Sequence, residues 1–268
     1  MLHSTLFLPL FALIAQCANL NYSGSALTGR HWDCCKPSCA WKGKADFTTP
    51  VLSCAADGHT PISDTAGTGC NGGDAFLCTA QQPWAVNDTV SYGFAGAFIL
   101  PSVTGGGTED VWCCSCYELM FTSAPLLGKR MIVQASNTAY DVKDQSRFAL
   151  AIPGGNTTSY DACALQFGVN QAVFGTDKTG VSTKEDCQNL PEPLKSGCEW
   201  RFDWFKDAMD PSVTFKRVLC PTEITQITGC VRNDEKVLAG DVLSAAVFVH
   251  IPSIVVGLAA VVWGMLLV

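Results

Sequence analysis

From residue 19 to residue 230 the chain consists of short apolar runs, which Gly, Asn, Asp or Ser interrupt about every ten residues. No long amphipathic period appears, so the pattern predicts a mostly β structure with long loops. The strand candidates, short and rich in β-branched or aromatic residues, are 95–100, 111–122 and 129–135. Helices are expected at 162–167 and at 184–190, where Ser182 and Thr183 can cap and Glu185 lies in the first turn.

An apolar segment at each end lies outside this pattern. Residues 1–18 combine an apolar run with the small residues Cys17 and Ala18, which is typical of a signal peptide and too short to span a bilayer. A short tether, 235–246, leads into an uncharged tail, 247–268. This order predicts a GPI-anchor signal that is cut away, and a retained membrane span is the alternative.

The remaining residues, 19–234, are expected to form one domain, because no internal repeat or linker to a second module is visible. We therefore expect an extracellular, monomeric protein, held at the cell surface through its C-terminal tail.

The cysteines support an oxidising compartment. The chain has 15, and loss of Cys17 with the signal peptide leaves an even number that can pair as disulfides. Neighbours such as Cys34-Cys35 and Cys113-Cys114 cannot both easily reach one tetrahedral zinc ion, so neither a metal nor a cofactor is expected. Spacing alone does not choose among the possible disulfide connectivities.

The formal net charge of −7 and pI near 5.0 exclude a nucleic-acid partner, because no basic stripe is present to neutralise phosphates. A neutral polymer fits this charge better. Asn-X-Ser/Thr triplets at Asn21, Asn87 and Asn156 are candidate glycosylation sites on surface loops.

Residues 29–41, GRHWDCCKPSCAW, place the Asp33 carboxylate beside Trp32 and next to three cysteines. This string closely resembles the signature of glycoside hydrolase family 45, the small inverting endo-β-1,4-glucanases. The resemblance continues through 83–88, 112–119, 152–155 and 198–205 and covers essentially all of residues 29–234. It implies a mostly β fold, a six-stranded double-psi β-barrel with long disulfide-stapled loops, a few short helices and an open groove for a β-1,4-glucan chain.

The family's disulfide pairing, carried over by position, implies seven bridges: Cys34–Cys163, Cys35–Cys70, Cys39–Cys113, Cys54–Cys78, Cys114–Cys230, Cys116–Cys220 and Cys187–Cys198.

The resemblance also assigns catalytic roles. Asp33 corresponds to the general base and Asp141 to an assisting carboxylate, while the family's general acid is replaced by Ala149. Inverting hydrolysis needs two carboxyl groups, one to activate water and one to protonate the leaving oxygen. Asp144, in a loop about one residue longer than is usual in the family, is a possible substitute acid, although the cations Lys143 and Arg147 beside it favour a carboxylate over a proton donor and argue against rescue.

Sugar contacts are expected from Trp32 and from His31, which stands where the family usually has a Tyr. Trp84 and Trp112 are further aromatic candidates, and Trp200 and Trp204, spaced four apart, are assigned to the core. Three functions remain open: an impaired endoglucanase, a non-catalytic glucan-binding protein at the cell surface, and, by analogy of fold alone, expansin-like loosening of wall polymers.

Overall fold

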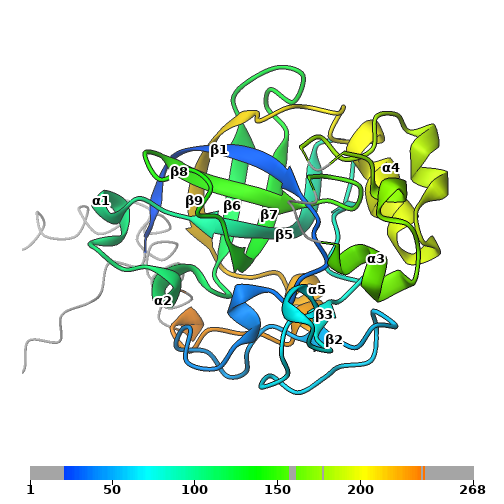
Figure 1. Cartoon of the computed structure of the whole chain (residues 1–268). Coiled ribbons are helices and arrows are strands. Elements are labelled where there is room, and N and C mark those ends of the chain that lie inside the picture. Colours follow the sequence, from blue (N-terminus) through cyan, green and yellow to red (C-terminus); the bar gives the residue numbers. More distant parts are fainter. Residues whose placement is uncertain (1–20, 157–160, 177, 237, 239–268) are drawn as a thin grey trace, which may run out of the picture.

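A computed structural model describes residues 21–156, 161–176, 178–236 and 238 of the chain. Six strands form a closed barrel in the order β5-β7-β6-β9-β1-β8, and β8 pairs back with β5 to complete it (Figure 1). Their bounds are β1 Ser23–His31, β5 Val90–Phe98, β6 Cys116–Phe121, β7 Arg130–Thr138, β8 Ser146–Ala151 and β9 Ser212–Val218. Two pairs, β1–β8 and β5–β7, run parallel, and the other pairs are antiparallel. The expected double-psi β-barrel is therefore confirmed.

Three short strands complete the β structure. β4, Trp84–Ala85, pairs with the start of β5 as a hairpin, while β2, Ser53–Cys54, and β3, Phe76–Leu77, form a separate two-stranded sheet. The strand expected at 111–122 is shorter than predicted, because Val111 and Trp112 belong to a helix and β6 begins only at Cys116. The interruption falls at Cys114, whose positive φ of 65° is incompatible with an extended strand.

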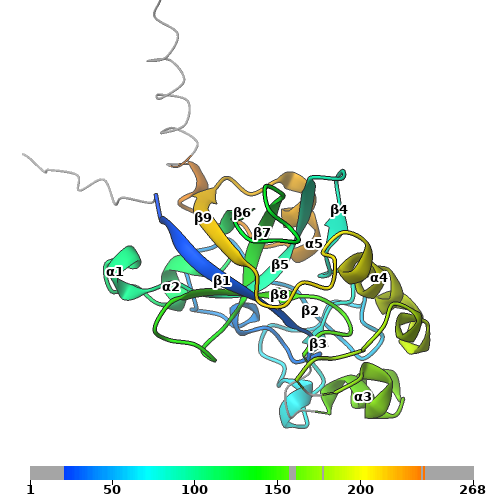
Figure 2. The same cartoon turned by 90° about the horizontal axis from the view of Figure 1, so that it is seen from above.

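Short helices cover the barrel on opposite sides. α1, Pro101–Thr104, and α2, Glu109–Trp112, lie on one side, and α3, Ala162–Phe167, and α4, Lys195–Asp203, lie on the other, as Figure 2 shows. A fifth helix, α5, spans Thr222–Thr228. Five 3₁₀ helices complete the described elements: η1 Ser38–Ala40, η2 Gly69–Asn71, η3 Gln171–Phe174, η4 Glu185–Asn189 and η5 Glu192–Leu194.

Both helices expected from the sequence are present. α3 has the bounds that the sequence predicts, whereas the second is the single 3₁₀ turn η4. The Thr183 hydroxyl accepts a hydrogen bond from the Asp186 amide at 3.3 Å, and the Asp186 carboxylate accepts one from the Thr183 amide at 2.9 Å. This reciprocal pair satisfies donors around the start of the turn, although the N-cap residue of η4 is Lys184, whose side chain makes no capping hydrogen bond, and not the predicted Ser182 or Thr183.

The barrel interior is filled by aromatic side chains at alternating strand positions. Tyr117, Phe148 and Phe215 are buried, with ring centroids 5.3 to 6.0 Å apart. Outside this group, the rings of Trp200 and Trp204 stack at 5.3 Å and are both buried, as their spacing on one helical face predicts.

All seven disulfides implied by the resemblance are present. Three of them join cysteines 104 to 129 positions apart, and so fasten distant loops to the barrel. Closing loops of this length restricts the unfolded chain, and in the chain-entropy account each such disulfide stabilises the fold by about 4 to 5 kcal/mol.

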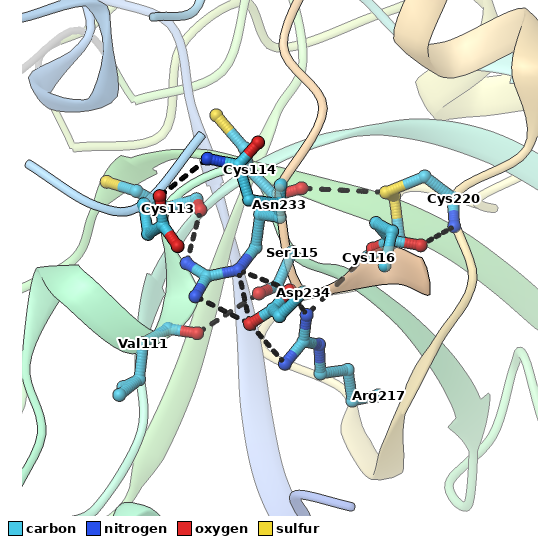
Figure 3. Close-up of polar contacts among 12 residues, drawn as sticks. Val111, Cys113, Cys114, Ser115, Cys116, Arg217, Cys220, Asn233 and Asp234 are labelled. Carbon is cyan, nitrogen blue, oxygen red and sulfur yellow. Dashed lines mark hydrogen bonds and ion pairs between the residues drawn. A yellow bond between two sulfur atoms is a disulfide. The ribbon is translucent and has the colours of Figure 1, made fainter. Parts of the chain in front are cut away.

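A buried ion cluster fastens the last described residues to the cysteine-rich centre. Asp234 accepts a hydrogen bond from Arg217, as Figure 3 shows, and another from Arg232. Arg232 also donates to the carbonyl of Cys113 at 3.1 Å. The Arg217 side chain has no exposed surface. Burial raises the pKa of Asp234, but the two guanidinium groups outweigh it, so the pKa is lowered overall.

Within the part of the chain that the structure describes, no helix is long and apolar enough to cross a bilayer. The expected signal peptide, most of the tether and the hydrophobic tail lie outside the described residues.

Candidate active site

A cleft of about 240 Å³ opens where β1, β7 and β8 meet. Because β1 and β8 are parallel, the ends of both strands arrive at the same place, with Gly29 opposite Ala149 and His31 opposite Ala151. The cleft is lined by Arg30, His31, Asp33, Gly96, Asn137, Thr138, Ala139, Tyr140, Asp141, Arg147, Ala149 and Asn156. Four positions assigned by resemblance, His31, Asp33, Asp141 and Ala149, thus meet in one cavity.

Asp33 lies just beyond the end of β1, and only 7% of its surface is exposed. One carboxylate oxygen accepts a hydrogen bond from the Cys35 amide at 2.9 Å. Cys34, between the two, has a φ of 61° and is bridged to Cys163, and Cys35 is bridged to Cys70. The two disulfides therefore hold a strained turn that fixes the direction of the Asp33 side chain.

His31 and Asp33 form an ion pair, with Nε2 3.5 Å from Oδ1. Burial favours the neutral form of His31, but the Asp33 charge and hydrogen bond, together with the Asp141 charge, outweigh burial and raise the pKa of His31 above its usual value. Burial likewise raises the pKa of Asp33, but His31 and the Cys35 amide outweigh it and lower the pKa overall. The charged pair is therefore the favoured state between the two pKa values.

Ala149 presents only a methyl group to the cleft. Its neighbours across both adjoining strands are glycines, Gly29 on β1 and Gly96 on β5. A side chain at position 29 would collide with Arg147, because an added Cβ would lie 2.5 Å from its guanidinium. The guanidinium therefore lies over Gly29, the residue opposite Ala149.

Arg147 connects three segments around the cleft. Its guanidinium forms ion pairs with Asp141 at 2.9 Å and with Asp210 at 3.5 Å, and donates to the Thr28 carbonyl at 3.4 Å. Arg147 and Ala149 are two residues apart on β8, and so face the same side of the sheet. The Asp141 carboxylate is therefore held by a cation on the strand that carries Ala149.

Two residues expected in the site lie outside it. Asp144 is exposed and does not line the cleft, so the structure does not support it as a substitute acid. Trp32 is a correction: it is 1% exposed and packs in the core with Phe76 and Phe174, because its side chain points away from the cleft that Asp33 enters. A buried ring cannot stack on a sugar, so the expected sugar contact of Trp32 is wrong.

The other aromatic candidates and the glycosylation triplets are also placed. Trp112 is buried, and Trp84 is partly buried against the core. Asn21 and Asn87 are exposed, as a glycan requires, whereas Asn156 lies in the cleft wall.

Sequence reasoning missed Arg30, Asn137 and Tyr140 as cleft residues. The available signal was position alone, since Arg30 precedes His31 and Tyr140 precedes Asp141. In the described ranges, no group of three His, Cys, Asp or Glu side chains converges on a metal position.

Residues 24–231 match the family model for Glycosyl hydrolase family 45. The chain belongs to glycosyl hydrolase family 45. An endoglucanase of Cryptopygus antarcticus is 44% identical over 226 residues, 84% of this chain and 97% of the relative. A Fusarium oxysporum relative assigned to endoglucanase type K is 46% identical over 228 residues, but this family 45 chain spans only 58% of its length.

A solved structure supports the same assignment. The crystal structure of a cellulase from the Antarctic springtail Cryptopygus antarcticus aligns with a TM-score of 0.74 and 45% identity, over 79% of this chain and 98% of that one. At 45% identity, the two proteins are similar in family 45 sequence as well as in fold.

Proposed function

We propose that this protein binds a β-1,4-glucan chain in the cleft beside Asp33 and hydrolyses it, by the inverting route, only weakly or not at all. The relatives named as endoglucanases and the cellulase structure support the substrate class. The observation that carries the impairment is the methyl group of Ala149, which faces the cleft at the position that the resemblance assigns to the proton donor.

Inverting hydrolysis requires a second carboxyl group, which protonates the leaving oxygen across the scissile bond from the base. Among the described cleft residues the carboxyl groups are those of Asp33 and Asp141, and Arg147 holds Asp141 at 2.9 Å. Loss of general-acid assistance costs about 10²- to 10⁴-fold in rate.

The His31–Asp33 ion pair also weakens hydrolysis. A lowered pKa makes Asp33 a weaker base toward water, because basicity falls with the pKa of the conjugate acid. Charged and polar groups that hinder proton abstraction can still orient sugar hydroxyls by hydrogen bonding. The cleft therefore favours binding over turnover.

The purified protein tests this function in two assays. Isothermal titration with cellohexaose measures binding, and reducing-end release from carboxymethyl cellulose, mixed-linkage β-glucan and glucomannan measures hydrolysis. We expect binding with little or no release. Rapid release that disappears in an Asp33→Asn variant would instead establish an active endoglucanase and make Asp141 the first candidate donor. Absence of cellohexaose binding, together with no release from any of the three polymers, would reject the glucan-binding function.

We infer that the protein acts outside the cell, as an anchored surface protein. Seven disulfides fit an oxidising compartment, and the terminal patterns fit secretion followed by GPI attachment. A phosphoinositide-specific phospholipase should release the protein from intact cells. A protein that stays on the membrane after treatment would support the retained span.

A further inference from the structure

An exposed aromatic ring forms part of the cleft wall. We propose that Tyr140 is a stacking platform for one pyranose ring of the bound glucan, beside Asp33. This inference rests on the proposed function and names the side chain that supplies apolar contact to the sugar.

The exposure of the aromatic residues singles out Tyr140. Of the tryptophans expected to serve sugar binding or the core, Trp32, Trp112, Trp200 and Trp204 are at most 6% exposed, and Trp84 is partly buried and does not line the cleft. Tyr140 is 46% exposed and is the aromatic member of the described cleft lining. Sugar rings present flat patches of C–H groups, which pack against the faces of aromatic rings. Tyr140 therefore offers this kind of surface inside the cavity that contains Asp33.

Both residues next to Tyr140 make contacts with other strands of the barrel. The preceding residue, Ala139, donates its amide to the Ala97 carbonyl at 3.1 Å and extends the pairing of β5 and β7. The following residue, Asp141, is held by Arg147. A residue between two anchored neighbours loses little backbone freedom when a ligand binds, which improves affinity.

The ring itself is supported from behind. Its centroid lies 5.8 Å from that of Phe98 and 6.3 Å from that of Trp112, with interplanar angles of 64° and 71°. Trp112 is in turn oriented by a hydrogen bond from its indole nitrogen to the Thr138 hydroxyl at 3.3 Å. Edge-to-face packing of this kind holds the ring in place without covering all of its surface.

One face of the ring is reachable from solvent. The ammonium group of Lys143, an exposed side chain, lies 5.7 Å from the Tyr140 ring centroid. A flexible lysine that reaches the ring from outside marks an approach that a sugar can also use once the lysine moves aside.

Two substitutions separate stacking from simple packing. Tyr140→Phe keeps the ring, whereas Tyr140→Leu keeps an apolar cover for Phe98 and Trp112 but removes the flat face. Calorimetric titration of each purified protein with cellohexaose should show wild-type affinity for Tyr140→Phe and about tenfold weaker affinity for Tyr140→Leu. Leu165→Ala, which removes an exposed apolar side chain from α3, should bind like wild type.

The outcomes separate failure of the Tyr140 inference from failure of the proposed glucan binding. Wild-type affinity of a folded Tyr140→Leu variant, or equal weakening by Leu and Phe, would overturn the platform while leaving glucan binding intact. Absence of cellohexaose binding by the wild-type protein would reject both. Should Tyr140→Leu fail to fold, NMR on the wild-type protein with ring-labelled tyrosine decides: nuclear Overhauser contacts to sugar C–H protons from the Tyr140 ring, assigned by its missing signal in Tyr140→Phe, support stacking, and their absence refutes it.

Discussion

Restoring a carboxyl group at position 149 should restore hydrolysis. Ala149 faces the cleft between Gly29 and Gly96, so a short acidic side chain there meets no bulky side chain on either neighbouring strand residue. We expect Ala149→Asp to gain about 10²- to 10⁴-fold in reducing-end release, the usual contribution of general-acid catalysis. Ala149→Asn has nearly the same shape but donates no acidic proton, so it is the matched control.

Arg147 should set the pH range of the restored activity. Residues two apart on a strand are separated by about 6.7 Å, a distance at which unit charges attract by about 2.5 kcal/mol at an effective dielectric constant of ~20. That energy would lower the pKa of a new carboxyl group at position 149 by up to about two units, before sharing with Asp141 and Asp210 weakens it. A general acid must stay protonated, so Ala149→Asp alone should work best in acid.

Adding Arg147→Gln to Ala149→Asp should move the basic limb of the pH–rate profile upward by about one to two units. Initial rates on carboxymethyl cellulose, measured from about pH 3 to about pH 8, cover the expected range of the basic limb. The reasoning is refuted by an Ala149→Asp protein that folds, binds cellohexaose like wild type and is no faster than Ala149→Asn at any pH. A basic limb that Arg147→Gln leaves in place would refute the electrostatic part alone.

Three further predictions concern charge and modification. The His31 pKa, measured by NMR titration, should lie above 6.5 in the wild type and fall in Asp33→Asn, which removes the Asp33 charge and hydrogen bond that oppose burial. The stability that this pair contributes is fully present between about pH 3.8 and 6.5, and it is lost as pH rises through the folded pKa of His31 or falls through the folded pKa of Asp33. An unchanged His31 pKa would contradict the coupling. Asp234→Ala should destabilise the fold by about 3 to 5 kcal/mol in denaturant unfolding, because it removes the carboxylate that two buried arginines share. Asp203→Ala at the exposed Lys184 pair should cost much less. Asn156 lies in the cleft wall, so a glycan found there by mass spectrometry should block the cleft, and its enzymatic removal should increase cellohexaose affinity. Equal affinity before and after removal would contradict the position of Asn156 in the cleft wall.

The sequence determined the local elements whose signals are short-range. The helix expected at 162–167 and the packed pair expected from the four-residue spacing of Trp200 and Trp204 are both present, because both depend on neighbours within a turn. The seven disulfides followed only from the family resemblance, since spacing leaves the connectivity open. The strand predicted at 111–122 failed where the positive φ of Cys114, inside a cluster of bridged cysteines, overrides β propensity.

Barrel closure decided the rest of the site, because it alone fixes which face of each strand is buried. The motif placed Trp32 beside Asp33, yet successive side chains on an extended segment point in opposite directions, and closure sends one into the core and the other into the cleft. The same closure brings Tyr140, from the loop after β7, and Arg147, from β8, to the cleft, although neither segment carries a sequence motif for sugar binding. The sequence thus determined that position 149 lacks a carboxyl group, and the tertiary structure decided which side chains surround that position.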